Sequence, residues 1–128
     1  MRKEEVRLRE VRKELVAAAA EGRTVCYGHL MKKFGIPRGH PRGKGIASVI
    51  GAVDDMERKK GAPGFASLVV RKDTGYPGGG FFCSADVPGR LRRPRSEGSN
   101  PRLTNAEKKY VDMLRKKAWM YYSRKRLG

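Results

Sequence analysis

Basic side chains alternate with glycine and proline between residues 38 and 45. Arg38, His40, Arg42 and Lys44 occupy every second position of the run Arg38-Gly39-His40-Pro41-Arg42-Gly43-Lys44-Gly45. Glycine leaves backbone amides accessible, and accessible amides beside cationic side chains suit contact with phosphate oxygens. The run therefore predicts a loop that grips a phosphate backbone.

Residues that could support catalysis or metal binding are few and scattered. Cys26 and Cys83 lie far apart and lack Cys-x-x-Cys spacing, so neither a disulfide framework nor a zinc knuckle is indicated. No histidine or arginine adjoins Cys83 in the sequence to activate its thiol. Asp54, Asp55 and Glu57 fall at the end of an expected helix, where solvated charge is the usual explanation. We therefore expect no catalytic residue, no metal and no cofactor.

The overall charge indicates a polyanionic partner. Lysine and arginine number 30 against 13 aspartate and glutamate, a formal net charge of +17 on 128 residues. Such a field attracts nucleic acids and makes their binding strongly salt-dependent, although charge alone does not separate DNA from RNA or an anionic membrane. The longest apolar run, residues 15–20, is too short to span a bilayer, and no secretory signal is visible. We expect a cytoplasmic, nucleoid-associated protein with no membrane partner.

Four helices are expected from the spacing of apolar residues. The clearest period belongs to the third helix, where Ile46, Val49, Ile50, Val53 and Met56 recur at helical intervals. Thr104 and Glu107 form a capping box for the last helix. Glycines 22 and 35 are expected to end the first two helices. The expected ranges are about 3–21, 28–34, 44–59 and 104–124.

The second and third helices describe a helix-turn-helix joined by a short turn and the basic loop. The third helix would read the DNA groove, and Ser48 near its start could approach base edges. Strands at residues 66–71 and 80–84 would form an antiparallel hairpin, the wing, with Arg71 and Lys72 near its tip. The predicted fold class is α+β, a winged helix-turn-helix with a small antiparallel wing and an additional basic C-terminal helix.

The composition changes after Asp86. Residues 87–103 are rich in proline, glycine, serine and arginine, which favours a poorly ordered linker. We therefore expect a winged-helix domain over residues 1–86, a basic flexible linker over 87–103 and a basic helix over 104–128. The linker and the last helix would add sequence-independent DNA affinity, the linker through Arg90, Arg92, Arg93 and Arg95.

Several short segments occur in a recognisable order. They are Val25-Cys26-Tyr27-Gly28-His29-Leu30, Gly35-Ile36-Pro37, Ala47-Ser48-Val49-Ile50-Gly51-Ala52, Phe65-Ala66-Ser67-Leu68-Val69-Val70 and Gly75-Tyr76-Pro77-Gly78-Gly79-Gly80. This order resembles the C-terminal domain of the alkylguanine-DNA alkyltransferases and the alkyltransferase-like proteins. The resemblance implies that Tyr27 presses on a target phosphate and helps rotate a nucleotide out of the stack.

Two catalytic features of that family are missing. The chain has no Pro-Cys-His-Arg segment, which carries the acceptor cysteine, and no arginine near Ala47 or Ser48 to fill the gap left by a flipped base. The resemblance thus implies a DNA grip without alkyl transfer. Our hypothesis is a non-catalytic protein that binds duplex DNA largely through phosphates.

Two alternatives remain open at this stage. One is a DNA-processing or lesion-recognition enzyme of alkyltransferase-like ancestry. The other is an RNA-binding or ribosome-associated protein, which is favoured by the basic C-terminal region and by aromatic residues that could stack on exposed bases. These aromatic residues are Trp119, Tyr121 and Tyr122.

Overall fold

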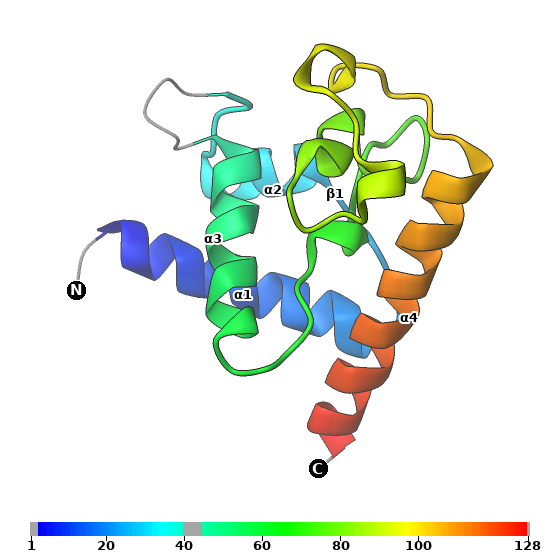
Figure 1. Ribbon diagram of the computed structural model, residues 1–128. Helices are drawn as coiled ribbons and strands as arrows, with labels where there is room; N and C mark the ends of the chain where they lie inside the picture. Colours follow the sequence, from blue (N-terminus) through cyan, green and yellow to red (C-terminus); the bar gives the residue numbers. More distant parts are fainter. Residues whose placement is uncertain (1–2, 40–44, 128) are drawn as a thin grey trace.

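Four α-helices and one pair of very short strands make up the described part of the chain. The computed structural model describes residues 3–39 and 45–127 (Figure 1). The elements follow in the order α1 (Lys3–Ala20), β1 (Val25–Cys26), α2 (Tyr27–Phe34), α3 (Ile46–Arg58), β2 (Val69–Val70) and α4 (Asn105–Leu127). Short 3-10 helices stand at Ala66–Leu68, Gly79–Cys83, Gly89–Leu91 and Arg95–Glu97. The fold class is α+β, as expected.

The helices begin and end close to the positions that the sequence predicted. Gly35 adopts the left-handed conformation (φ 62°) after α2, and the amide of Ile36 donates to the carbonyl of Met31. Gly22 ends α1 in the same way, at φ 70°. At the start of α4 the Thr104 amide donates to the Glu107 carboxylate (2.8 Å), and the Glu107 amide donates to the Thr104 hydroxyl (3.1 Å). The predicted capping box is confirmed.

The predicted antiparallel wing is wrong. Strand β2 pairs in parallel with β1, in the register Val25 to Val69 and Cys26 to Val70. The second expected strand, residues 80–84, belongs instead largely to the 3-10 helix Gly79–Cys83. A Cβ at Gly79 would collide with the carbonyl oxygen of Asn100, so this glycine permits a close backbone approach that an extended strand would not make.

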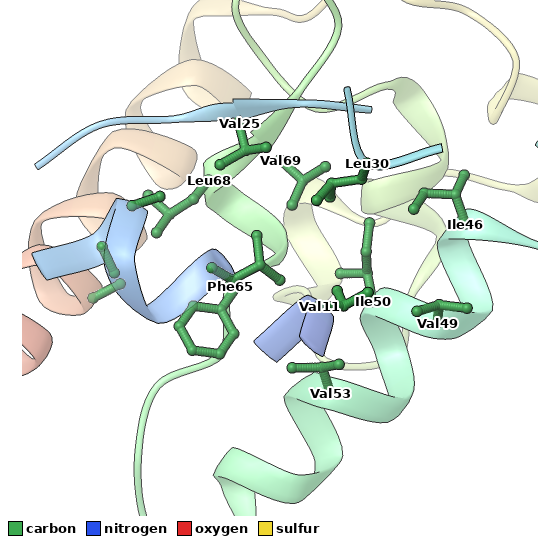
Figure 2. Packing of buried hydrophobic residues seen from close by; sticks show 14 of the residues in the cluster. Val11, Val25, Leu30, Ile46, Val49, Ile50, Val53, Phe65, Leu68 and Val69 are labelled. Carbon is green, nitrogen blue, oxygen red and sulfur yellow. The ribbon is translucent and has the colours of Figure 1, made fainter. Parts of the chain in front are cut away.

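The main hydrophobic cluster joins all four helices to the sheet. Figure 2 shows its central residues, which come from α1, β1, α2, α3 and the segment around β2. Helix α4 also reaches this cluster through Ala118 and Tyr122. The ring of Tyr122 lies 4.8 Å from that of Phe65, measured between centroids. The last helix is therefore part of the core.

A second hydrophobic cluster lies under residues 87–103. It consists of Phe82, Val87, Leu103 and Val111. Residues 87–103 therefore follow a defined path along the domain, in contrast to the flexible linker expected from their composition. Composition does not show that Val87 and Leu103 of this segment are buried and that two of its arginines bond to the surrounding backbone.

One of these arginines is Arg93, whose guanidinium is almost fully enclosed. It donates two hydrogen bonds of 2.7 Å to the carboxylate of Glu107. It also donates to the backbone carbonyls of Glu97, Asn100 and Arg102 at 3.2, 2.9 and 2.8 Å. A guanidinium presents five N–H donors in a planar fork, so one side chain can organise several carbonyls at once. Arg93 thus ties the segment to the start of α4.

A buried carboxylate ties three helices together. Glu57 of α3 is 1% exposed and accepts hydrogen bonds from Arg12 of α1 at 2.8 and 3.1 Å. The Tyr122 hydroxyl of α4 lies 3.0 Å from the same carboxylate and 2.7 Å from the carbonyl of Pro63. Burial alone would raise the pKa of Glu57, but hydrogen bonds from Arg12 and Tyr122 outweigh it and lower the pKa. Glu57 is therefore ionised and paired at neutral pH.

Candidate nucleic-acid interface

The connection between α2 and α3 is longer than the short turn that we expected. It runs from Gly35 to Gly45, whereas helix-turn-helix motifs commonly use about 3–4 residues. The Ile46 amide donates to the Pro37 carbonyl at 2.9 Å, which joins the two ends of the connection. A Cβ on Gly45 would lie 2.8 Å from the carbonyl oxygen of Arg38, so glycine is needed where the ends meet. His40, Arg42 and Lys44 lie outside the described residues.

The exposed side of α3 begins with small side chains. Ala47, Ser48 and Gly51 are exposed, while Val49 and Ile50 on the opposite side are buried. Small side chains let another molecule approach the helix backbone closely. The structure thus places Ser48 at an accessible position in the first turn of α3.

Exposed cationic side chains lie on the segments that precede this turn, and one of them was missed by the sequence reasoning. Arg38 is exposed at the start of the basic loop, and Lys32 is exposed near the end of α2. Neither forms an ion pair within residues 3–39 and 45–127. Lys33 and His29 share the carboxylate of Glu14 at 2.7 and 2.9 Å, and these hydrogen bonds lower the pKa of Glu14. Lys32 could have been found as an outward position of the second helix.

Tyr27 occupies a more enclosed position than a phosphate contact requires. It is the first residue of α2, and burial raises the pKa of its hydroxyl, although a hydrogen bond from the backbone of Gly78 and the nearby charge of Arg71 oppose that shift. The fold therefore brings Tyr27 and Arg71, two residues predicted to contact DNA, near each other. The tyrosine also packs against the main hydrophobic cluster.

The tip of the expected wing is a tight turn over residues 71–76. The Arg71 amide donates to the Tyr76 carbonyl and the Gly75 amide to the Arg71 carbonyl, both at 2.9 Å. The Arg71 guanidinium is engaged by Asp73 through hydrogen bonds of 2.9 and 2.8 Å, while Lys72 is exposed. Because Asp73 neutralises Arg71 locally, Lys72 is the more available cation of the two.

The four arginines of segment 87–103 that were expected to contact DNA divide into two kinds. Arg93 is enclosed as described, and Arg92 donates to the carbonyls of Ala85 and Val87 at 3.0 and 3.1 Å. These two hold the backbone, which differs from the DNA contacts expected of them. Arg90 and Arg95 are exposed on short 3-10 helices. Arg90 and Arg95 are therefore more available to a partner than Arg93 is.

A cleft of about 550 Å³ opens beside the same face of α3. Its walls include Ala47 and Gly51 of α3, Phe81 of the 79–83 helix and Tyr110 of α4. This volume falls within the range of small-molecule sites. Tyr27 lines the cleft as well, so the aromatic side chains come from three separate segments.

The polar groups in the cleft serve mainly to fix its walls. Burial raises the pKa of Asp54 to about 6, while amide hydrogen bonds from Phe65 (2.6 Å) and Ala66 (3.2 Å) oppose the shift. The thiol of Cys83 lies 3.6 Å from the carbonyl of Pro94 and does not line the cleft. Over residues 3–39 and 45–127, no three His, Cys, Asp or Glu side chains gather closely enough to hold a metal ion.

No family model matches this chain, and no significant match was found among curated proteins or solved structures. The likeness to the alkyltransferase domain therefore rests on the short motifs quoted above. In the described part of the chain, every helix is too short or too polar to cross a membrane.

Proposed function

We propose that this protein binds duplex DNA without catalysis and grips phosphates through the α2–α3 region. The observation that carries this proposal is the exposed first turn of α3 with its small side chains, preceded in the chain by exposed cations that lack carboxylate partners among the described residues. A groove could approach the α3 backbone at Ala47 and Ser48, and Arg38 and Lys32 would contact the flanking phosphates. The protein would then be nucleoid-associated and bind as a helix-turn-helix protein.

Exposed carboxylates near the C-terminal end of α3 restrict DNA to the N-terminal half of this helix. Asp55 lies toward the far end of the helix, where Arg58 pairs with it at 3.3 Å and with Asp86 at 2.9 Å. These exposed carboxylates would repel a phosphate backbone. DNA is therefore expected to meet the first turn of α3 and the basic loop, and not the end of the helix.

The remaining predicted contacts would act at the edge of this surface. Lys72 extends from the turn beside Tyr27, and Arg90 and Arg95 are exposed on segment 87–103. His40, Arg42 and Lys44 belong to the proposed grip by their place in the basic loop. Exposed cations of this kind add affinity for any sequence, because each neutralised phosphate releases condensed counterions.

The test compares two pairs of cations that carry equal charge. Lys32→Gln with Arg38→Gln removes two proposed contacts, and Arg9→Gln with Lys13→Gln removes two exposed cations of α1. Duplex binding by the full chain is measured by fluorescence anisotropy from about 50 to 200 mM salt. The first pair should weaken binding and reduce the slope of log affinity against log salt by about 2, since each phosphate contributes about 0.9.

Three outcomes would count against this proposal. Equal losses from the two pairs would mean that only total charge matters. A slope of log affinity against log salt near zero in the unaltered protein would show that it does not contact phosphates. Tighter binding of structured RNA than of duplex DNA at one salt concentration would identify an RNA-binding protein instead.

The cleft favours a second candidate function, recognition of a base turned out of the duplex. Ala47 and Gly51 belong both to the proposed DNA face and to the cleft wall, so a rotated nucleotide would have a short path into it. Extrusion costs a few kcal/mol, least for a mismatched or damaged base. Duplexes with a single 2-aminopurine, matched or mismatched, test this: fluorescence should rise on binding, and Gly51→Leu should abolish the rise without abolishing duplex binding.

A further inference from the structure

Two methionines on one face of α4 are exposed without a partner. The large apolar side chains that stand exposed in the described residues are Val6, Met113 (43% exposed) and Met120 (54% exposed). Met113 and Met120 are separated by seven residues, which is close to two helical turns and places both on one side of the helix. The buried residues of α4, including Val111, Ala118 and Tyr122, lie on the opposite side.

Lysines bracket both methionines at intervals of one turn. Lys109 and Lys116 lie four residues before and three residues after Met113, and Lys116 lies four residues before Met120. Together with Lys117 and Asp112 these residues line a shallow groove on the outer face of α4. Figure 1 shows α4 along one side of the domain, and the methionines and lysines of this face are exposed.

The lysines of this face have no carboxylate to neutralise them within the described part of the chain. Asp112 is the acidic residue of the groove, and its carboxylate already lies 3.2 Å from the Tyr76 hydroxyl and 3.8 Å from Arg115. The face therefore combines unneutralised positive charge with exposed apolar surface. The apolar surface gains free energy when a partner covers it, and the lysines favour a partner that carries carboxylates beside its own apolar residues.

We propose that the outer face of α4 docks an acidic amphipathic helix of another protein. Carboxylates on such a helix would face Lys109 and Lys116, and its apolar side chains would cover Met113 and Met120 in a helix-against-helix seam. A second copy of this face does not fit, because lysines would meet lysines. A phosphate backbone would match the lysines but leave both methionines against ionised oxygens. This docking does not depend on the proposed DNA binding.

The probe is a fluorescein-labelled synthetic helix of about three heptads with leucine along its seam and glutamate beside it. Its anisotropy is followed as the full chain is added. Met113→Gln with Met120→Gln should weaken binding roughly tenfold through lost apolar burial. Lys109→Gln with Lys116→Gln should weaken it by a similar factor, and more at low salt. The matched control, Arg9→Gln with Lys13→Gln, should change it by no more than about twofold.

Circular dichroism verifies that each variant keeps its helix content, as expected for exposed positions. Equal binding of a scrambled peptide of identical composition would overturn the proposal, because it would show that the lysines attract any acidic peptide. A loss of duplex-DNA affinity caused by the methionine pair would assign the face to nucleic acid. A loss of binding to phosphatidylserine vesicles caused by the same pair would assign it to a membrane surface.

Discussion

Replacing Glu57 by glutamine should destabilise the protein by removing the charge that joins α1, α3 and α4. Removing one partner of a fully buried ion pair costs about 3–5 kcal/mol. Here the Arg12 side chain is 33% exposed and can regain water, and glutamine still offers Tyr122 an oxygen. We therefore expect a loss of about 2 kcal/mol, which lowers the melting temperature of a chain of this size by about 7 °C.

The loss should depend on pH in a defined direction. The folded-state pKa of Glu57 is lowered, so its ionised form contributes stability above the unfolded-state pKa of about 4.3. That contribution disappears as the pH falls through the lower folded-state pKa. The difference between the wild-type protein and Glu57→Gln should therefore be constant near pH 7 and shrink steadily below about pH 4.

Urea unfolding at a series of pH values, followed by Trp119 fluorescence, measures both effects. The indole of Trp119 donates to the Arg23 carbonyl at 3.2 Å, so its environment changes when α4 leaves α1. Glu10→Gln, at an exposed position of α1, is the control and should change stability by less than about 0.5 kcal/mol. A Glu57→Gln protein as stable as the wild type, or a deficit that is the same at pH 3 and pH 7, would refute this reasoning.

Three further predictions follow from the packing. Removal of residues 104–128 should leave a chain that circular dichroism finds largely unfolded, because Tyr122 and its neighbours complete the main cluster; a cooperative melt of the shortened chain would show that the rest folds alone. Arg93→Gln should lower stability by about 3 kcal/mol in thermal melts, whereas Arg95→Gln should be nearly neutral. In a single-turnover assay with alkylated oligonucleotide, neither wild-type protein nor Cys83→Ser should acquire an alkyl group, and a modified Cys83 in the mass spectrum would contradict the non-catalytic assignment.

The helices could be predicted from the sequence because local signals determine them. The apolar period of α3, the glycine after α2 and the capping box before α4 each act over a few residues, and the structure agrees with all three. The partner of β2 could not be predicted in this way. Its pairing with β1 joins residues that are far apart along the chain, and a two-residue strand is too short to show an alternation of polar and apolar residues.

The candidate interface was predictable in outline only. Net charge and the alternation of cations with glycine point to a phosphate contact, and Arg38 and Ser48 are accessible as that reasoning requires. The sequence does not reveal which arginines are already engaged in hydrogen bonds within the protein. Arg90 and Arg93 look alike in the sequence, but of the two only Arg93 bonds to a buried carboxylate and to three backbone carbonyls, all supplied by the fold.

The hydrogen bond between the Ile46 amide and the Pro37 carbonyl holds α2 and α3 together independently of the loop residues between them. Because the ends of the connection are fixed to each other, with Gly45 fitted against the Arg38 carbonyl, the helices on either side keep their places whatever lies between. Lengthening a closed segment costs little, since the closure entropy grows only with the logarithm of its length. Substitutions or insertions between Gly39 and Gly45 should therefore cost the fold little, so this segment could vary while the scaffold stays unchanged.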